Sequence, residues 1–180
     1  MKVCVFGAAS SKIDKRYIKI AKQLGEKLVR GGHSLIFGAG ATGLMGAVAE
    51  GAKSHGGYIH GIVPTFFEEE GFDVPYSLSD RITLTADIAE RKKKMYELSD
   101  VFIVLPGGIG TLEEFFEVVS LKQFCRHDKK IILFNIEGYY DDFINFIRKC
   151  EKDGFILGGI DKLFSDVNSV DGIVSLLDKY

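Results

Sequence analysis

The sequence predicts an α/β protein built on a three-layer, doubly wound and mostly parallel sheet. Short apolar runs, typical of strands covered on both faces, alternate along the chain with segments of helical periodicity. Such alternation implies parallel strands joined by right-handed crossovers. The 180 residues suit one domain, residues 1–180. Ligands of such folds bind beyond the carboxyl ends of the strands, so a site is expected in the loops there.

The first half of the chain is expected to alternate strand and helix. Residues 3–6 form a continuous apolar run closed by Gly7. Apolar residues recur at helical spacing over residues 13–28, and Gly31-Gly32 supplies a left-handed stop. The elements expected next are a strand at 34–37, a helix at 43–54 and a strand at 58–63 that Pro64 ends.

A long loop is expected to divide the two halves. Residues 65–80 contain three consecutive glutamates and look like a connection long enough to be functional, such as a lid over a site. The strand at 101–105 is the most apolar and is expected to be central. The other elements expected are a strand at 82–84, a helix at 86–98, a helix at 111–124, a strand at 131–134, a helix at 139–152 and a closing amphipathic segment to 180.

Composition excludes several classes of protein. A net charge of −2 argues against a nucleic-acid partner, because such binding depends on many cations across one surface. No apolar run approaches the roughly 18 residues of a membrane span, so a soluble, cytoplasmic protein with no membrane partner is expected. Three scattered cysteines and four histidines show no ligand spacing, so neither a disulfide framework nor a metal site is expected.

Glycine is in excess, since 21 of the 180 residues, about 12%, are glycine against a usual share of about 7%. One glycine loop, residues 38–43, fits GxGxxG between a strand and a helix and leaves dinucleotide binding open as an alternative. However, no acidic residue follows about 20 positions later to bind a ribose hydroxyl. The structural alternative is that these glycines allow a helix to pack closely on the sheet. It accounts for Gly46, and only partly for Gly38 and Gly40.

The second glycine loop, residues 106–111, favours a phosphate site. It ends the most apolar strand and opens a helix whose first amide N–H groups have no internal partners. Those donors and the helix dipole attract anions, and Gly107, Gly108 and Gly110 let a phosphate approach the backbone. Thr111 adds a hydroxyl. The loop lacks the Lys-Ser/Thr pair of a Walker motif, so a monophosphate is expected rather than ATP.

Charged residues near this loop have two readings. Thr111 and Glu114 have the spacing of a capping box, which alone explains an acid there. Yet Glu113 and Glu114 would repel a bound phosphate, so their presence suggests a chemical task. Arg91 and Lys92 are candidates for the vicinity of the phosphate, whereas the two lysines that follow suit a solvated helix face.

At this point the sequence resembles a known family, the LONELY GUY cytokinin riboside 5′-monophosphate phosphoribohydrolases. Residues 106–114 match PGGxGTxxE, and Arg91-Lys92 matches the Arg-Lys that precedes this motif in the family. Similar segments run through nearly the whole chain, namely residues 7–11, 43–46, 61–64, 98–100 and 135–140. Many family members carry the description lysine decarboxylase-like.

The resemblance implies a Rossmann-like homodimer that needs no cofactor and hydrolyses the N-glycosidic bond of AMP or an N6-prenylated AMP. It implies Arg91 and Glu114 as the catalytic pair. It implies that the nucleotide site is lined by Lys92, Gly107, Gly108, Gly110, Thr111 and Glu113.

The helix expected at 111–124 is apolar on nearly every side, which suits the implied dimer. The family's usual Met-His before the Arg-Lys is missing, which bears on base and prenyl preference. Decarboxylation is not expected, because pyridoxal chemistry needs a Schiff-base lysine, a phosphate cup and a pyridinium partner, none of which the sequence indicates. A non-catalytic nucleotide-binding or carrier protein on the same fold is the alternative function.

Overall fold

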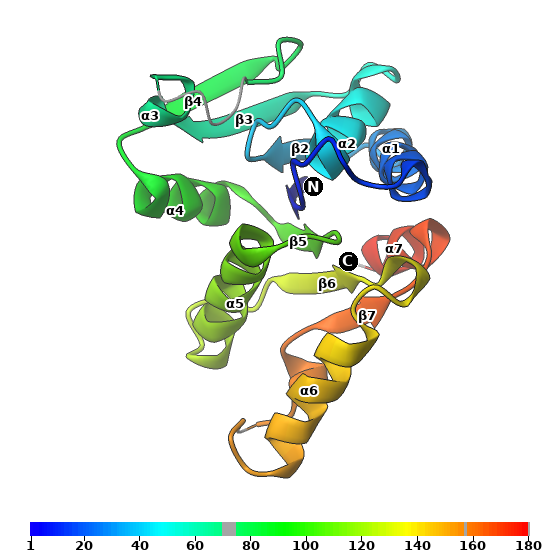
Figure 1. Ribbon diagram of the computed structural model, residues 1–180, viewed down its shortest axis with the longest axis vertical. Coiled ribbons are helices and arrows are strands. Elements are labelled where there is room, and N and C mark those ends of the chain that lie inside the picture. Colours follow the sequence, from blue (N-terminus) through cyan, green and yellow to red (C-terminus); the bar gives the residue numbers. More distant parts are fainter. Residues whose placement is uncertain (70–74, 157, 180) are drawn as a thin grey trace.

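The protein is described by a computed structural model that covers residues 1–69, 75–156 and 158–179 (Figure 1). These residues form one seven-stranded sheet in which each pair of neighbouring strands is parallel. The strands are β1 (Lys2–Phe6), β2 (Ser34–Phe37), β3 (Ile59–Pro64), β4 (Arg81–Thr85), β5 (Val101–Val104), β6 (Lys130–Phe134) and β7 (Ser165–Val167). Their order across the sheet is β4-β3-β2-β1-β5-β6-β7.

Two expectations about the strands were wrong. β1 holds the middle position and β5 lies beside it, so the most apolar strand is interior but not central. β7 lies in the closing segment that was expected to be only amphipathic. It is a three-residue edge strand with two residues exposed, so it lacks the apolar run that indicates the interior strands.

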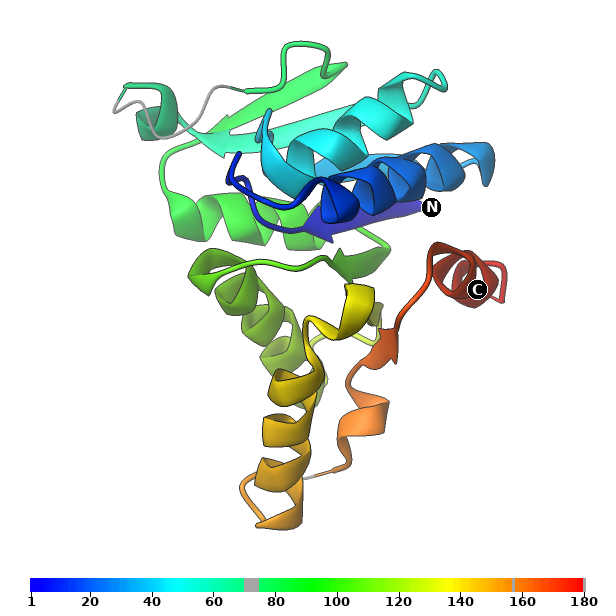
Figure 2. The same ribbon diagram turned by 45° about the vertical axis from the view of Figure 1, so that its right-hand side comes forward.

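Helices cover both faces of the sheet and give the expected three layers (Figure 2). The helices are α1 (Lys15–Arg30), α2 (Gly43–Lys53), α3 (Thr65–Glu69), α4 (Ile88–Leu98), α5 (Ile109–Gln123), α6 (Asp141–Lys152) and α7 (Val170–Leu177), with short 3-10 turns η1 (Ile136–Gly138) and η2 (Ile160–Lys162). Alternate strand residues face opposite layers: Val3 and Val5 join a core with α1, α2 and α7, whereas Cys4 and Phe6 join one with α4, α5 and α6.

The connection expected as a long loop is partly helical. Its first residues form α3, and residues 70–74, on which the lid hypothesis partly rests, lie outside the described residues. After them Pro75 forms an isolated bridge with Gly40, and the Tyr76 N–H donates to the Ala39 carbonyl at 2.8 Å. The end of this connection is therefore fastened to the loop that follows β2.

The direction of chain crossover changes between β1 and β5. The helix after β1 packs on one face of the sheet and the helix after β5 packs on the other. The two loops between them separate at the carboxyl edge, which is where ligands of doubly wound folds bind. One hydrogen bond, from the Ala8 N–H to the Pro106 carbonyl at 3.2 Å, joins the loops. Among the described residues, no helix is long and apolar enough to cross a membrane.

Close contact between α1 and α2 yields a stability prediction. A Cβ at Gly51 would lie 1.9 Å from the Lys22 carbonyl oxygen, and one at Gly25 would lie 2.0 Å from the Val48 oxygen. Alanine normally stabilises a helix over glycine by about 1 kcal/mol. Here we expect Gly51→Ala to lower the free energy of unfolding by about 1–3 kcal/mol, because the helices must separate.

Urea denaturation measures this effect. Gln23→Ala on the exposed side of α1 is the control, with an expected change within about 0.5 kcal/mol. A stabilised Gly51→Ala protein would show that the two helices do not touch through these glycines.

Candidate active site

Helix α4 begins with a capping box that sets the position of Arg91. The Asp87 carboxylate accepts a hydrogen bond from the Glu90 N–H at 2.8 Å, and the Glu90 carboxylate accepts one from the Ala86 N–H at 2.8 Å. The two carboxylates therefore cap the start of the helix in both directions, with Glu90 reaching the residue before the N-cap Asp87. Arg91 follows in the first turn and points back into the protein, with only 8% of its surface exposed.

The Arg91 guanidinium lies in a slot built from three neighbouring segments. Its Nε donates to the carbonyl of Ile62, within β3, at 3.1 Å, and the Phe67 ring lies 5.8 Å from its central carbon. A Cβ at Gly38 would lie 1.9 Å from Nη2. Glycine at position 38 therefore leaves room for the guanidinium in this position, a contact that the sequence pattern did not indicate.

Glu114 lies on α5 opposite Arg91 and forms a buried ion pair with it. The Arg91 Nη1 donates to the Glu114 Oε1 at 3.2 Å, and Glu114 is 8% exposed. Burial raises the pKa of the Glu114 carboxyl to about 7, and Arg91 only partly offsets this. The site thus holds a carboxyl that exchanges its proton near neutral pH.

The capping box suggested for Thr111 and Glu114 was wrong. Helix α5 begins two residues earlier, with Gly108 as its N-cap and no side chain bonded to the cap. Thr111 and Glu114 therefore lie inside the helix, where both are buried. The acid at position 114 is not explained by helix capping.

The loop before α5 presents backbone donors. The first amide to bond within this turn is that of Leu112, which donates to the Gly108 carbonyl at 3.0 Å, so the N–H groups before it have no helical acceptor. A Cβ at Gly108 or Gly110 would meet nothing within 4 Å. At Gly107 it would lie 2.1 Å from the Thr111 hydroxyl oxygen, so that glycine is required for packing.

Lys92 forms a second, outer set of ion pairs between α4 and α5. Its ammonium group bonds to the Glu113 carboxylate and lies 3.1 Å from that of Glu117. Burial opposes the charge on Lys92, but the two glutamates outweigh it and raise the pKa of the amine. The lysine was expected to line the site, whereas the structure directs its charge to these two carboxylates.

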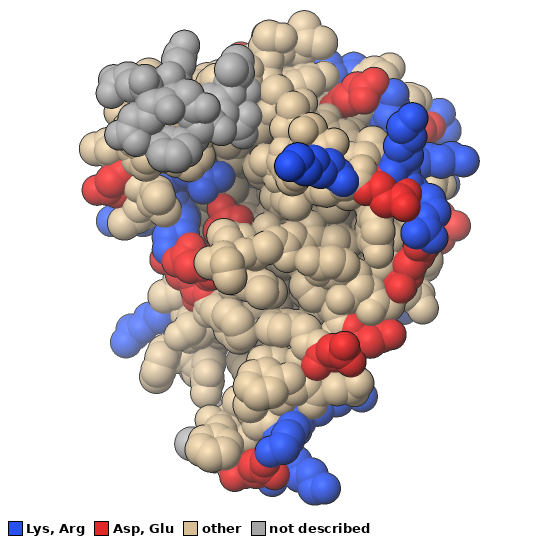
Figure 3. All heavy atoms as spheres, in the orientation of Figure 1, with Lys and Arg blue, Asp and Glu red and all other residues tan. Residues whose placement is uncertain are grey.

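These features surround an open cavity of about 570 Å³. The expected residues along its wall are Arg91, Gly108, Gly110, Thr111, Glu113 and Glu114, without Lys92 or Gly107. Residues outside the expected site set complete the lining, namely Met45, Phe67, Ile88 and Ile109 with residues 7–10 of the loop after β1. Of these, Met45 and residues 7–10 lie in segments that resemble the family. The surface around this edge of the sheet carries uncharged residues at its centre, with charged side chains at the borders (Figure 3).

The other glycine loop is closed to a ligand. The first N–H groups of helix α2 have no acceptor within the helix. Those of Leu44 and Met45 instead donate to the Ala8 carbonyl, at 2.8 and 3.4 Å. Gly43 has a φ of +62°, and a Cβ there would lie 2.5 Å from the same oxygen. The GxGxxG pattern therefore serves to pack the β1 loop against α2, and this geometry disfavours the dinucleotide alternative.

Fold and site together define a Rossmann-like protein with a buried acid–arginine pair beside a glycine-rich loop. A family model described as "Possible lysine decarboxylase" matches residues 45–177. The cytokinin riboside 5′-monophosphate phosphoribohydrolase LOG5 of Arabidopsis thaliana is 38% identical over 99% of this chain and 78% of its own. A probable enzyme of the same name from Oryza sativa subsp. japonica, LOGL9, is 37% identical with the same coverage. The chain belongs to this family, LONELY GUY.

Solved structures of lower sequence identity share the fold. The molybdenum cofactor carrier protein of Chlamydomonas reinhardtii superimposes with a TM-score of 0.73 at 20% identity, covering 99% of this chain and 95% of the other. The molybdenum cofactor binding protein of Rippkaea orientalis gives 0.72 at 22% identity with the same coverage. These likenesses confirm the α/β fold.

The raised pKa of Glu114 makes stability depend on pH. The folded protein keeps this proton up to about pH 7, whereas an ordinary glutamate loses it near 4.5. Between these values the folded state binds more protons than the unfolded state, so this group lowers the free energy of unfolding as pH rises. We expect the stability of Glu114→Gln relative to the unmodified protein to increase from pH 5 to pH 8.

Urea denaturation at both pH values tests this expectation. The exposed Glu97 provides a matched control, since Glu97→Gln should keep the same stability difference at both. A Glu114→Gln difference independent of pH would show that the carboxyl titrates normally.

Proposed function

We propose that the protein hydrolyses the N-glycosidic bond of AMP or an N6-prenylated AMP, giving the free base and ribose 5-phosphate. The observation that carries this proposal is the buried Arg91–Glu114 pair facing the same cavity as the open start of α5. The relatives at 37% and 38% identity are named for this reaction on cytokinin riboside 5′-monophosphates.

The start of α5 would bind the phosphate. A Cβ at Gly108 or Gly110 would meet nothing within 4 Å, so the backbone there is open to a ligand, and the helix dipole adds a partial positive charge. Thr111 lies at the same wall of the cavity. The Lys92 ammonium would reduce the repulsion between the substrate phosphate and Glu113, because it already neutralises that carboxylate.

Glu114 and Arg91 would act on the bond between sugar and base. This cleavage passes through an oxocarbenium-like state, which an ionised carboxylate stabilises. The Glu114 carboxylate would take a proton from water as the water oxygen bonds to C1′. The base leaves with the electrons of the C1′–N9 bond and takes up one proton from solvent, and Glu114 then releases the proton it received from water, which restores the carboxylate. Arg91 holds the carboxylate in place by the 3.2 Å hydrogen bond.

The description "Possible lysine decarboxylase" of the family model has no counterpart in the cavity wall, because no lysine among the described residues lines it. Lys92, which follows Arg91 in the chain, is bound to Glu113 and Glu117. A lysine that forms a Schiff base needs a free amine, and these carboxylates hold this one charged.

Substitution of the acid tests the reaction. We expect Glu114→Gln to lower kcat for release of base from AMP by about 10²–10⁴, the range for loss of a positioned acid–base group. Chromatography of the free base after incubation with AMP and prenyl-AMP measures the rate. Glu97→Gln, on the exposed side of α4, should retain full activity.

Two results would contradict the proposal. Release of no base from any purine monophosphate would exclude the reaction. Tight binding of AMP in calorimetry without turnover would support the non-catalytic binding or carrier alternative instead.

We further propose that the protein is a cytoplasmic homodimer that associates through α5 and α6. Phe116 on α5 is 44% exposed, Phe124 directly after α5 is 68% exposed, and Phe146 on α6 is 61% exposed. An apolar groove of about 160 Å³ runs between these helices and includes Phe116. Aromatic side chains at such exposure are typical of an interface with a second protein surface.

A charge at this surface is expected to separate the subunits. Analytical ultracentrifugation should give twice the 19.9 kDa mass of one chain for the unmodified protein and a single-chain mass for Phe124→Glu. Leu78→Glu is the control, because Leu78 is 57% exposed but lies in the connection between β3 and β4. Dimers of unchanged stability in Phe124→Glu would place the interface elsewhere.

A further inference from the structure

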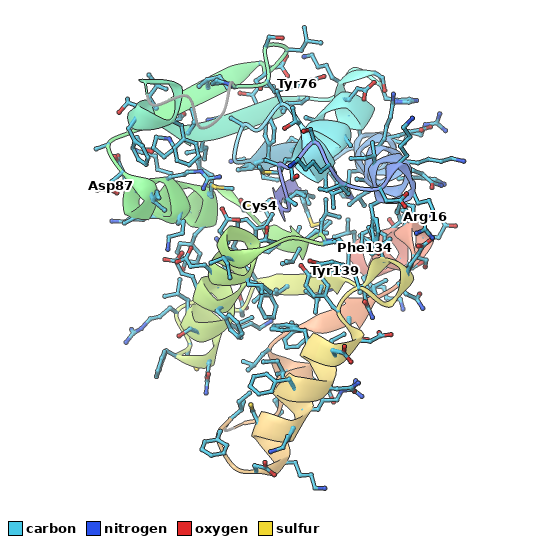
Figure 4. All side chains as sticks on the ribbon, in the orientation of Figure 1. Cys4, Arg16, Tyr76, Asp87, Phe134 and Tyr139 are labelled. Atoms are coloured by element: carbon cyan, nitrogen blue, oxygen red, sulfur yellow. The ribbon has the colours of Figure 1, made fainter. Side chains whose placement is uncertain are left out.

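Two adjacent tyrosines hold the carbonyl groups of the loop that precedes α5. The Tyr139 hydroxyl donates to the Gly107 carbonyl at 3.0 Å, and the Tyr140 hydroxyl donates to the Leu105 carbonyl at 2.7 Å. Tyr139 is labelled in Figure 4, in the connection between β6 and α6. These hydrogen bonds join segments more than thirty residues apart in the chain.

The hydrogen bond from Tyr139 affects the direction of one backbone donor, the Gly108 N–H. A trans peptide is planar, so its C=O and N–H point in opposite directions. The Gly107 carbonyl belongs to the same peptide as the Gly108 N–H. Because the carbonyl points to Tyr139, which lines a small apolar pocket on the α1 side of the loop, the N–H is turned to the other side. Gly108 also lines the large cavity with Arg91 and Glu114.

The tyrosine at 140 provides an internal comparison. The peptide that follows the Leu105 carbonyl ends in Pro106, which has no N–H. The Tyr140 hydroxyl therefore fixes a carbonyl of the same loop without orienting a donor in that peptide. Tyr140 is 2% exposed and Tyr139 is 47% exposed, so loss of the Tyr140 hydroxyl should lower the stability of the fold more than loss of the Tyr139 hydroxyl.

The connection that carries both tyrosines is itself rigidly built. Asn135 accepts a hydrogen bond from the Tyr140 N–H at 2.7 Å and donates to Asp141 at 2.7 Å. Glu137 and Gly138 both have positive φ values, 50° and 75°, and reverse the chain before the tyrosines. The Tyr139 ring also makes edge contacts with Tyr17 and Tyr140. The hydroxyl is thus delivered to the Gly107 carbonyl by a preformed turn.

We propose that Tyr139 is a positioning residue for the anion site: through the Gly107–Gly108 peptide it keeps the Gly108 N–H directed at the substrate phosphate. The phosphate itself rests on the proposed function, but the same donor would serve any phosphomonoester at this loop. In Tyr139→Phe the ring and its aromatic contacts remain and only the hydroxyl is lost. The peptide is then free to rotate, and the donor is no longer held ready.

Binding and kinetics of matched variants test this role. For Tyr139→Phe we expect the Kd of ribose 5-phosphate and the KM of AMP to rise about 3- to 10-fold, the equivalent of one hydrogen bond. The kcat at saturation and the affinity for adenosine, which has no phosphate, should stay unchanged. Tyr140→Phe should lower the melting temperature and leave the Kd of ribose 5-phosphate unchanged.

The outcomes separate this inference from the proposed function. Weaker ribose 5-phosphate binding in Tyr139→Phe supports it even if the unmodified protein releases no base from AMP. It is overturned if Tyr139→Phe binds ribose 5-phosphate normally, if affinity for adenosine falls equally, or if Tyr140→Phe weakens phosphate binding as much. Absence of any ribose 5-phosphate binding to the unmodified protein would also overturn it.

Discussion

The buried ion pair between Arg91 and Glu114 is the interaction on which the site depends. Taking both charges out of water costs several kcal/mol per ion unless the geometry is good and further hydrogen bonds are made. The structure meets that condition with the Ile62 carbonyl and with a slot that glycine at position 38 leaves open. One guanidinium therefore lies between strand β3, the loop after β2 and helices α4 and α5, and it fixes their relative positions.

The charged residues around this pair form an inner, buried set and an outer, more exposed set. The inner carboxyl, Glu114, is buried enough to release its proton only near pH 7, whereas Lys92 serves the outer acids Glu113 and Glu117. A phosphate approaching the start of α5 therefore meets acids that are already partnered by cations. This arrangement reconciles two features that conflict in the sequence, adjacent glutamates and an anion-binding loop.

Much of the fold could be predicted because strands such as β1 and β6 are uninterrupted apolar runs between turns. β7 was missed because its pairing with β6 comes from tertiary position and not from its own residues. The Thr111 and Glu114 spacing predicted a cap at the wrong place, since a local motif does not show where a helix begins. The role of Gly38 depends on an arginine far along the chain, and no local pattern contains such a contact.

The donors that face the cavity at the start of α5 belong to the main chain. A point substitution removes a side chain but leaves an amide in place, so this part of the site is insulated from most mutations. Met45, Phe67 and Ile88 also line the cavity, and they do so with side chains that a substitution can change. Single substitutions can therefore change the part of the cavity that side chains line, while the backbone donors of the phosphate loop stay in place.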